Sequence, residues 1–126
     1  MSEKIYLAGP ITSEPNYREN FADGVEELRK FSKGCKVVNP AEFFEGPAWK
    51  IAFRVFGKKF FYPYILRRCI GKLSRCDSIA LLPGWSESPG AIAEYFFAYA
   101  CEYDSIYLAG SERLDEDGYK IDSFLN

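Results

Sequence analysis

The sequence predicts a three-layer α/β fold with a mostly parallel sheet of four to five strands and helices on both faces. Short apolar runs bounded by turn residues alternate with helical patterns of about four turns. This alternation is typical of right-handed βαβ units, which favour the strand order 2-1-3-4, with a fifth strand at the edge giving 2-1-3-4-5. A length of 126 residues and a hydrophobic content of 48% fit a single domain, residues 1–126, with one core.

The first strand is expected at residues 4–8 (KIYLA), an apolar run that the turn residues Gly9 and Pro10 end. The second strand is expected at residues 36–39 (KVVN), and residues 40–47 are expected to form a loop. Both strands are short, so each needs its neighbours in a sheet to be stable.

A helix connects these two strands. Apolar residues recur at helical spacing from Tyr17 to Phe31, and Gly34 is a stop signal. Asn16, with Glu19 three residues later, resembles a capping box.

The stretch of residues 49–75 is basic and aromatic. It contains eight lysines and arginines, no acidic residue and seven interleaved aromatic residues. Gly57 and Pro63 divide it into two expected helices at 47–56 and 64–75. The basic residues form either a solvated helix face or a surface that contacts phosphates.

The second half repeats the strand–helix pattern. A buried strand is expected at residues 78–82, followed by a loop and a helix that begins at Ser88-Pro89 and runs to residue 100. A fourth strand is expected at 105–108 and one more short strand near 119–121.

Composition excludes several function classes. A net charge of −2 and a pI near 5.2 argue against a general nucleic-acid binder. The four cysteines form no CxxC pair and histidine is absent, so we expect no metal site and no cofactor. Without a signal peptide or an apolar run near 18 residues, the expectation is a cytoplasmic protein that does not enter membranes. Acid–base chemistry must then fall to carboxyl, thiol or phenol groups.

The candidate site lies between the carboxyl ends of the first and third strands, where open α/β sheets bind ligands. Ser88 and the free N–H groups of the following helical turn favour an anion, and Ser86 lies in the same loop. Gly9 and Gly90 allow a ligand to approach the backbone closely, and Tyr6 supplies a ring or a hydroxyl.

Glu94 is a charged residue among apolar ones, six residues after the helix start. In a half-apolar pocket its pKa would be raised by desolvation, and it would still be able to attack an electrophilic sugar carbon. Simpler interpretations stay open: Ser88-Pro89 is only a helix cap, and Glu94 is solvated or paired with Arg67 or Arg68.

Several motifs occur together in a fixed order: KIYLAGP, NP after the second strand, RCDSIALLPGWSESPGA, and E-x-x-x-A in the last helix. In these motifs the chain resembles the nucleoside 2-deoxyribosyltransferase-like superfamily over roughly residues 4–108. The resemblance is greatest to a group of short phage and bacterial proteins with the pattern LPGW-x-x-S-x-GA-x-x-E, and extends to 2′-deoxynucleoside 5′-monophosphate N-glycosidases. It implies a flavodoxin-like (Rossmann-like) sheet, cleavage of an N-glycosidic bond, and a site completed at a subunit interface.

The resemblance also implies roles for single residues. Glu94 matches the nucleophilic glutamate of the superfamily, and Ser88 matches the serine that holds a 5′-phosphate. Tyr6 matches a tyrosine of the sugar pocket. Gly9 and Pro10 belong to the loop that wraps around the nucleotide.

One position departs from the superfamily pattern. Eight residues before Asp77, which matches a structural aspartate, the superfamily carries an aspartate that contacts the sugar or protonates the leaving base. This chain has Cys69 there. A thiol is a weak donor and is uncharged unless its pKa is lowered, which Arg67 and Arg68 would favour.

Two main hypotheses follow. The first is an N-glycosidase or deoxyribosyltransferase that acts on a (deoxy)nucleoside monophosphate through Glu94. The second is a nucleotide-binding module that sequesters or senses its ligand, favoured by the missing aspartate. A weaker third is single-strand nucleic-acid binding through residues 49–75. The aromatic content of 17% exceeds what a small core needs, which predicts a homo-oligomer.

Overall fold

The computed structural model of the chain describes residues 3–11, 14–44 and 48–113. These residues contain one sheet of four parallel strands: β1 (Lys4–Ala8), β2 (Lys36–Val38), β3 (Ser78–Leu81) and β4 (Asp104–Tyr107). The strand order is β2-β1-β3-β4, which confirms the predicted order for four strands. The fifth strand expected near 119–121 lies outside the described residues.

The central strand β1 separates the two halves of the core, because successive side chains of a strand point to opposite faces. Ile5 and Leu7 face helix α1 (Tyr17–Phe31), and Tyr6 and Ala8 face the other layer. Tyr6 pairs in register with Val38 of β2 and with Ile79 of β3. All four of these β1 residues are fully buried.

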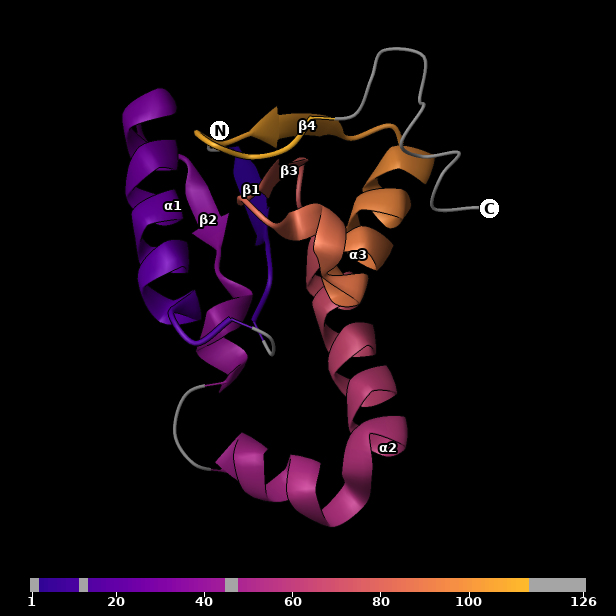
Figure 1. Cartoon of the computed structure of the whole chain (residues 1–126). Coiled ribbons are helices and arrows are strands. Elements are labelled where there is room, and N and C mark those ends of the chain that lie inside the picture. Colours follow the sequence, from indigo (N-terminus) through magenta and orange to yellow (C-terminus); the bar gives the residue numbers. More distant parts are fainter. Residues whose placement is uncertain (1–2, 12–13, 45–47, 114–126) are drawn as a thin grey trace.

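Helix α1 covers one face of the sheet (Figure 1). It places Phe21 and Leu28 in the core, with Gly24 at the point of closest approach. A Cβ atom at Gly24 would lie 2.9 Å from Leu82 Cδ2 and 3.1 Å from Leu7 Cδ2, so only glycine fits here without displacing its neighbours.

Helices α2 (Ala48–Leu73) and α3 (Pro89–Ala100) lie on the other side, which completes the predicted three layers (Figure 1). The predicted break of α2 at Pro63 is wrong, because the chain is helical on both sides of this exposed proline. The kink lies at Gly57, with φ +77° and ψ 168°, a conformation essentially restricted to glycine. The predicted break at Gly57 is confirmed, and the structure has two helical segments, 48–56 and 58–73, joined at that residue.

Two local expectations in the first half are also corrected. Asn16 occupies the N-cap position of α1, but its side chain makes no cap hydrogen bond. Instead, Glu14 Oε1 accepts a hydrogen bond from the Asn16 N–H at 3.1 Å, so the proposed capping box is absent. The expected loop after β2 contains a short 3₁₀ helix, η1 (Pro40–Phe44).

No helix in the described part of the chain combines the length and the apolar content that crossing a bilayer requires.

Candidate active site

The start of α3 is built as the sequence predicts. Ser88 is the N-cap, its Oγ accepts a hydrogen bond from the Ala91 N–H at 3.4 Å, and Pro89 follows at the first helical position. Ser88 also ends the short 3₁₀ helix η2 (Trp85–Glu87), because its own N–H donates to the Trp85 carbonyl. The direction in which α3 leaves the sheet is therefore fixed at both sides of Ser88.

Glu94 lies in the second turn of α3 and points into the core. Only 6% of the residue is exposed, although most buried positions around it are apolar. Its Oε2 accepts a hydrogen bond from the hydroxyl of Tyr6, which comes from the middle of β1. No basic side chain of the described residues pairs with Glu94. Both the solvated and the arginine-paired interpretations of this residue are therefore wrong.

Burial controls the protonation of this pair. It raises the pKa of Glu94 from 4.5 to about 8, and the hydrogen bond from Tyr6 offsets part of that increase. The pKa of Tyr6 is raised well above 10, first by burial and then by the charge of Glu94. At pH 7 the Glu94 carboxyl is therefore mostly protonated.

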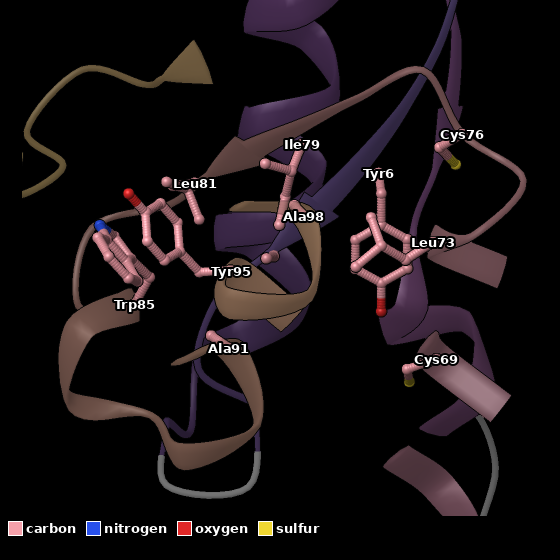
Figure 2. Close-up of a cluster of buried hydrophobic side chains, with 11 residues drawn as sticks. Tyr6, Cys69, Leu73, Cys76, Ile79, Leu81, Trp85, Ala91, Tyr95 and Ala98 are labelled. Atoms are coloured by element: carbon pink, nitrogen blue, oxygen red, sulfur yellow. The ribbon is translucent and has the colours of Figure 1, made fainter. Parts of the chain in front are cut away.

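Cys69 is the third buried member of the site and comes from the second half of α2. Figure 2 shows the Tyr6 ring extending toward the helix that carries Cys69. Burial and the charge of Glu94 raise the pKa of the thiol to about 12. A hydrogen bond with Tyr6 and the charges of Arg68 and Lys72 act in the opposite direction but are outweighed. Arg68 therefore lowers the pKa of the thiol as expected, but too little to produce a thiolate at neutral pH.

Large apolar side chains surround these three polar groups. Leu73 and Ile79 belong to the same buried cluster as Tyr6 and Cys69, whereas the rings of Trp85 and Tyr95, with centroids 4.8 Å apart, lie on the other side of α3 from Tyr6 (Figure 2). Such a lining excludes water and strengthens electrostatic interactions inside the site. A carboxyl, a phenol and a thiol thus share one low-dielectric region between β1, α2 and α3.

The loop between β3 and α3 contains an acceptor that sequence reasoning missed. The Glu112 carboxylate accepts hydrogen bonds from the Gly84 N–H at 2.7 Å, the Ser86 N–H at 3.1 Å and the Ser86 hydroxyl. The pKa of Glu112 is lowered because these hydrogen bonds outweigh its partial desolvation. Ser86, predicted to bind substrate, is therefore occupied by a residue of the chain itself.

The remaining predicted residues are divided between two faces. A Cβ atom at Gly9 would lie 2.8 Å from Leu82 Cβ, so the Gly9 backbone packs closely against the residue that follows β3. Pro10 lines a cavity of about 320 Å³ on the α1 side, together with Gly24 and Leu82. Gly90 lies on the exposed first turn of α3, with open space around it. Tyr6, Cys69 and Glu94 are therefore brought together, whereas Pro10 lies apart from them.

Asp77, expected to be structural, has a backbone partner in strand β1. Asp77 Oδ2 accepts a hydrogen bond from the Lys4 N–H at 2.9 Å, which ties the start of β1 to the turn before β3. Within the described ranges, no three cysteine or acidic side chains gather closely enough to hold a metal ion.

These features define a parallel α/β domain with a buried carboxyl–phenol–thiol cluster between its central strand and two helices. A family described as a domain of unknown function (DUF4406) matches residues 3–107, so the chain belongs to the DUF4406 family. The matched stretch contains Tyr6, Cys69, Ser88 and Glu94 and ends before Glu112. No curated protein and no solved structure matches the chain.

Proposed function

We propose that this protein cleaves the N-glycosidic bond of a (deoxy)nucleoside 5′-monophosphate, with Glu94 as the nucleophile. The observation that carries the proposal is the burial of the Glu94 carboxyl against the Tyr6 hydroxyl. A buried carboxyl without a basic partner is costly for a fold, and perturbed groups of this kind concentrate at functional sites. The resemblance to nucleoside 2-deoxyribosyltransferase-like proteins supports the same chemistry.

The proposed reaction follows the logic of a retaining glycosidase. A Glu94 oxygen forms a bond to C1′ while the C1′–N bond breaks and its electron pair leaves with the base, which takes a proton from water. Water or a second base then attacks C1′ of the glycosyl ester and releases the carboxylate. Water gives hydrolysis, and a second base gives transfer.

Tyr6 and Cys69 contribute differently to this proposed reaction. The Tyr6 hydroxyl donates to the carboxylate, holds its orientation and favours its ionised form. Cys69, with a pKa of about 12, is a poor proton donor at neutral pH. The site therefore supplies a nucleophile with little help for the departing base.

The other end of the substrate lies at the start of α3. Ser88 precedes Glu94 by six residues, or about 9 Å along a helix at 1.5 Å per residue. This span suits a sugar that presents its 5′-phosphate to Ser88 and the Gly90 N–H while C1′ approaches Glu94. The helix dipole favours an anion at this end.

The test is release of free base, measured by liquid chromatography, over a panel of nucleoside monophosphates. Wild type should release base faster as the pH rises from 6 toward 9, because the ionised fraction of Glu94 increases through about pH 8. Glu94→Ala should lose the activity, and Glu26→Ala, at an exposed glutamate of α1, should retain it. No release by wild type, or equal release by Glu94→Ala, would contradict the proposal.

A second candidate is a nucleotide-binding module that leaves its ligand intact. It is favoured by the pKa of about 8, which keeps most Glu94 side chains protonated at neutral pH, and by the weakly acidic thiol beside them. Calorimetry with mono-, di- and cyclic nucleotides distinguishes the two candidates. Tight binding with complete recovery of the ligand supports the module, whereas free base in the calorimetry sample after the titration supports catalysis.

We also propose that the protein forms a homo-oligomer. Large apolar side chains are exposed on both halves of α2 and on α3, at Ile51, Val55, Tyr64 and Tyr99. Such side chains often mark contact surfaces when they lie together. Light scattering during gel filtration measures the mass, and a mass of 14.4 kDa at all concentrations would contradict self-association.

A further inference from the structure

The segment that follows β4 is fastened to the loop before α3 by one residue. The carboxylate of Glu112 accepts from two backbone N–H groups and one hydroxyl of residues 84–86. Its backbone carbonyl accepts a fourth hydrogen bond, from Trp85 Nε1 at 2.8 Å. Four contacts across 26 to 28 positions of sequence converge on this residue.

Through the 84–88 loop, these hydrogen bonds connect Glu112 with both ends of the proposed site. Gly84 adopts a left-handed conformation, with φ +86°, and begins η2, which ends at Ser88, the N-cap of α3. The Trp85 ring packs on Tyr95, the residue next to Glu94. Movement of the loop would therefore displace both the anion-binding end and the helix that carries the carboxyl.

We infer that Glu112 is a positioning residue, whose carboxylate fixes the 84–88 loop so that Ser88 and the start of α3 meet the phosphate of the substrate. This inference rests on the proposed function. A carboxylate suits the task because it accepts several hydrogen bonds at once, from donors that would otherwise be partly buried without an acceptor.

The opposite interpretation is that Glu112 occupies the phosphate site and competes with the substrate. The hydrogen bonds argue against it. The Glu112 partners are Gly84, Trp85 and Ser86, whereas Ser88 Oγ and the Gly90 N–H are not among them. The two interpretations predict opposite changes in affinity when Glu112 is removed.

The experiment compares a nucleoside 5′-monophosphate with the same nucleoside lacking the phosphate, by steady-state kinetics. Because hydrogen bonds to charged groups are lost, Glu112→Ala should raise KM for the monophosphate by about tenfold while KM for the nucleoside changes less than about twofold. Glu112→Gln should show an intermediate increase, since its amide oxygen still accepts from Gly84 but its NH₂ group cannot accept from Ser86.

Glu27→Ala is the matched control. Glu27 Oε2 accepts a hydrogen bond from the Ala109 N–H at 2.9 Å, so it fastens the same segment without reaching the 84–88 loop. It should leave the ratio of the two KM values unchanged. Equal changes for both substrates with Glu112→Ala would mean that Glu112 is only structural, and a lower KM for the monophosphate would mean competition; either result overturns the inference.

Calorimetry with the nucleoside monophosphate separates this inference from the proposed function. If wild type releases no base, the proposed function fails, but a loss of about tenfold in monophosphate affinity with Glu112→Ala, and a smaller loss with Glu112→Gln, still supports the positioning role. Unchanged or tighter binding, or no binding of the monophosphate by wild type, overturns it. Glu112→Gln preserves side-chain size, so it serves if the alanine variant does not fold.

Discussion

Replacing Glu94 with glutamine should make the protein more stable, and by an amount that grows with pH. Glutamine keeps the size of the side chain and an acceptor for the Tyr6 hydroxyl but cannot ionise. In wild type, the folded chain holds a proton on Glu94 up to about pH 8, whereas the unfolded chain releases it near pH 4.5. The folded state therefore binds more protons between these values, and wild-type stability falls as the pH rises across this window.

The size of the effect follows from the two pKa values. At 1.36 kcal/mol per pKa unit, moving from 4.5 to about 8 corresponds to roughly 5 kcal/mol between the fully protonated and fully ionised limits. About 3 kcal/mol of this is expressed at pH 7, where the unfolded carboxyl is ionised and the folded one is mostly protonated. That is a large fraction of a typical domain stability of about 5–15 kcal/mol.

The assay is urea unfolding followed by circular dichroism at pH 5, 7 and 9, for wild type and Glu94→Gln. The free energies of unfolding of the two proteins should differ by less than about 1 kcal/mol at pH 5. At pH 7 that of the variant should be higher by about 3 kcal/mol. Taking the difference between the proteins cancels the titration of all other groups. Glu26→Gln, at an exposed glutamate of α1, controls for the loss of one surface carboxylate.

Two outcomes would refute the reasoning. A stability difference that stays flat from pH 5 to pH 9 would show that Glu94 titrates alike in the folded and unfolded chain. A free energy of unfolding that rises with pH in wild type relative to the variant would show that the fold stabilises the carboxylate. Tyr6→Phe provides a further check: it removes the hydrogen bond that lowers the pKa of Glu94, so the window should extend to higher pH.

Three further predictions concern single positions. Gly24→Ala should lower stability by about 1–3 kcal/mol in thermal unfolding, because its Cβ would overlap Leu82, and unchanged stability would contradict the packing described. Ser88→Ala should cost about 1 kcal/mol through the lost N-cap, with Ser88→Asn restoring it; equal stability of all three proteins would exclude a capping role. Gly57→Ala should destabilise by about 1–3 kcal/mol because φ is +77°, whereas Gly71→Ala in the same helix should stabilise by up to about 1 kcal/mol; the same sign for both would argue against the kink.

The sheet was predictable because its signals are local and repeated. Each described strand is a short apolar run between turn residues, and alternation with helices leaves few possible topologies. Ser88-Pro89 marked the start of α3, because a hydroxyl N-cap and a proline at the first helical position act within one turn. The convergence of Tyr6, Cys69 and Glu94 followed from the resemblance and the topology together.

The errors have local causes at Pro63 and Asn16 and a long-range cause at Glu112. Pro63 removes only one backbone donor from a helix that continues past it, whereas the break predicted at Gly57 is confirmed. Asn16 had a plausible capping pattern, but Glu14 supplied the acceptor. Glu112 had no signal in the sequence, because its partners lie 26 or more positions away in a loop whose shape depends on the left-handed Gly84.

Tyr6 lies in the central strand with no exposed surface, and it is also the residue that touches the Glu94 carboxyl. The fold and the proposed chemistry would therefore use the same side chains, and neither could be altered alone. Replacing these polar residues with leucine and phenylalanine would give a more stable protein but would remove the proposed nucleophile. If the proposed site is correct, substrate preference would be more easily altered at the exposed first turn of α3, where a change at Gly90 leaves the interior intact.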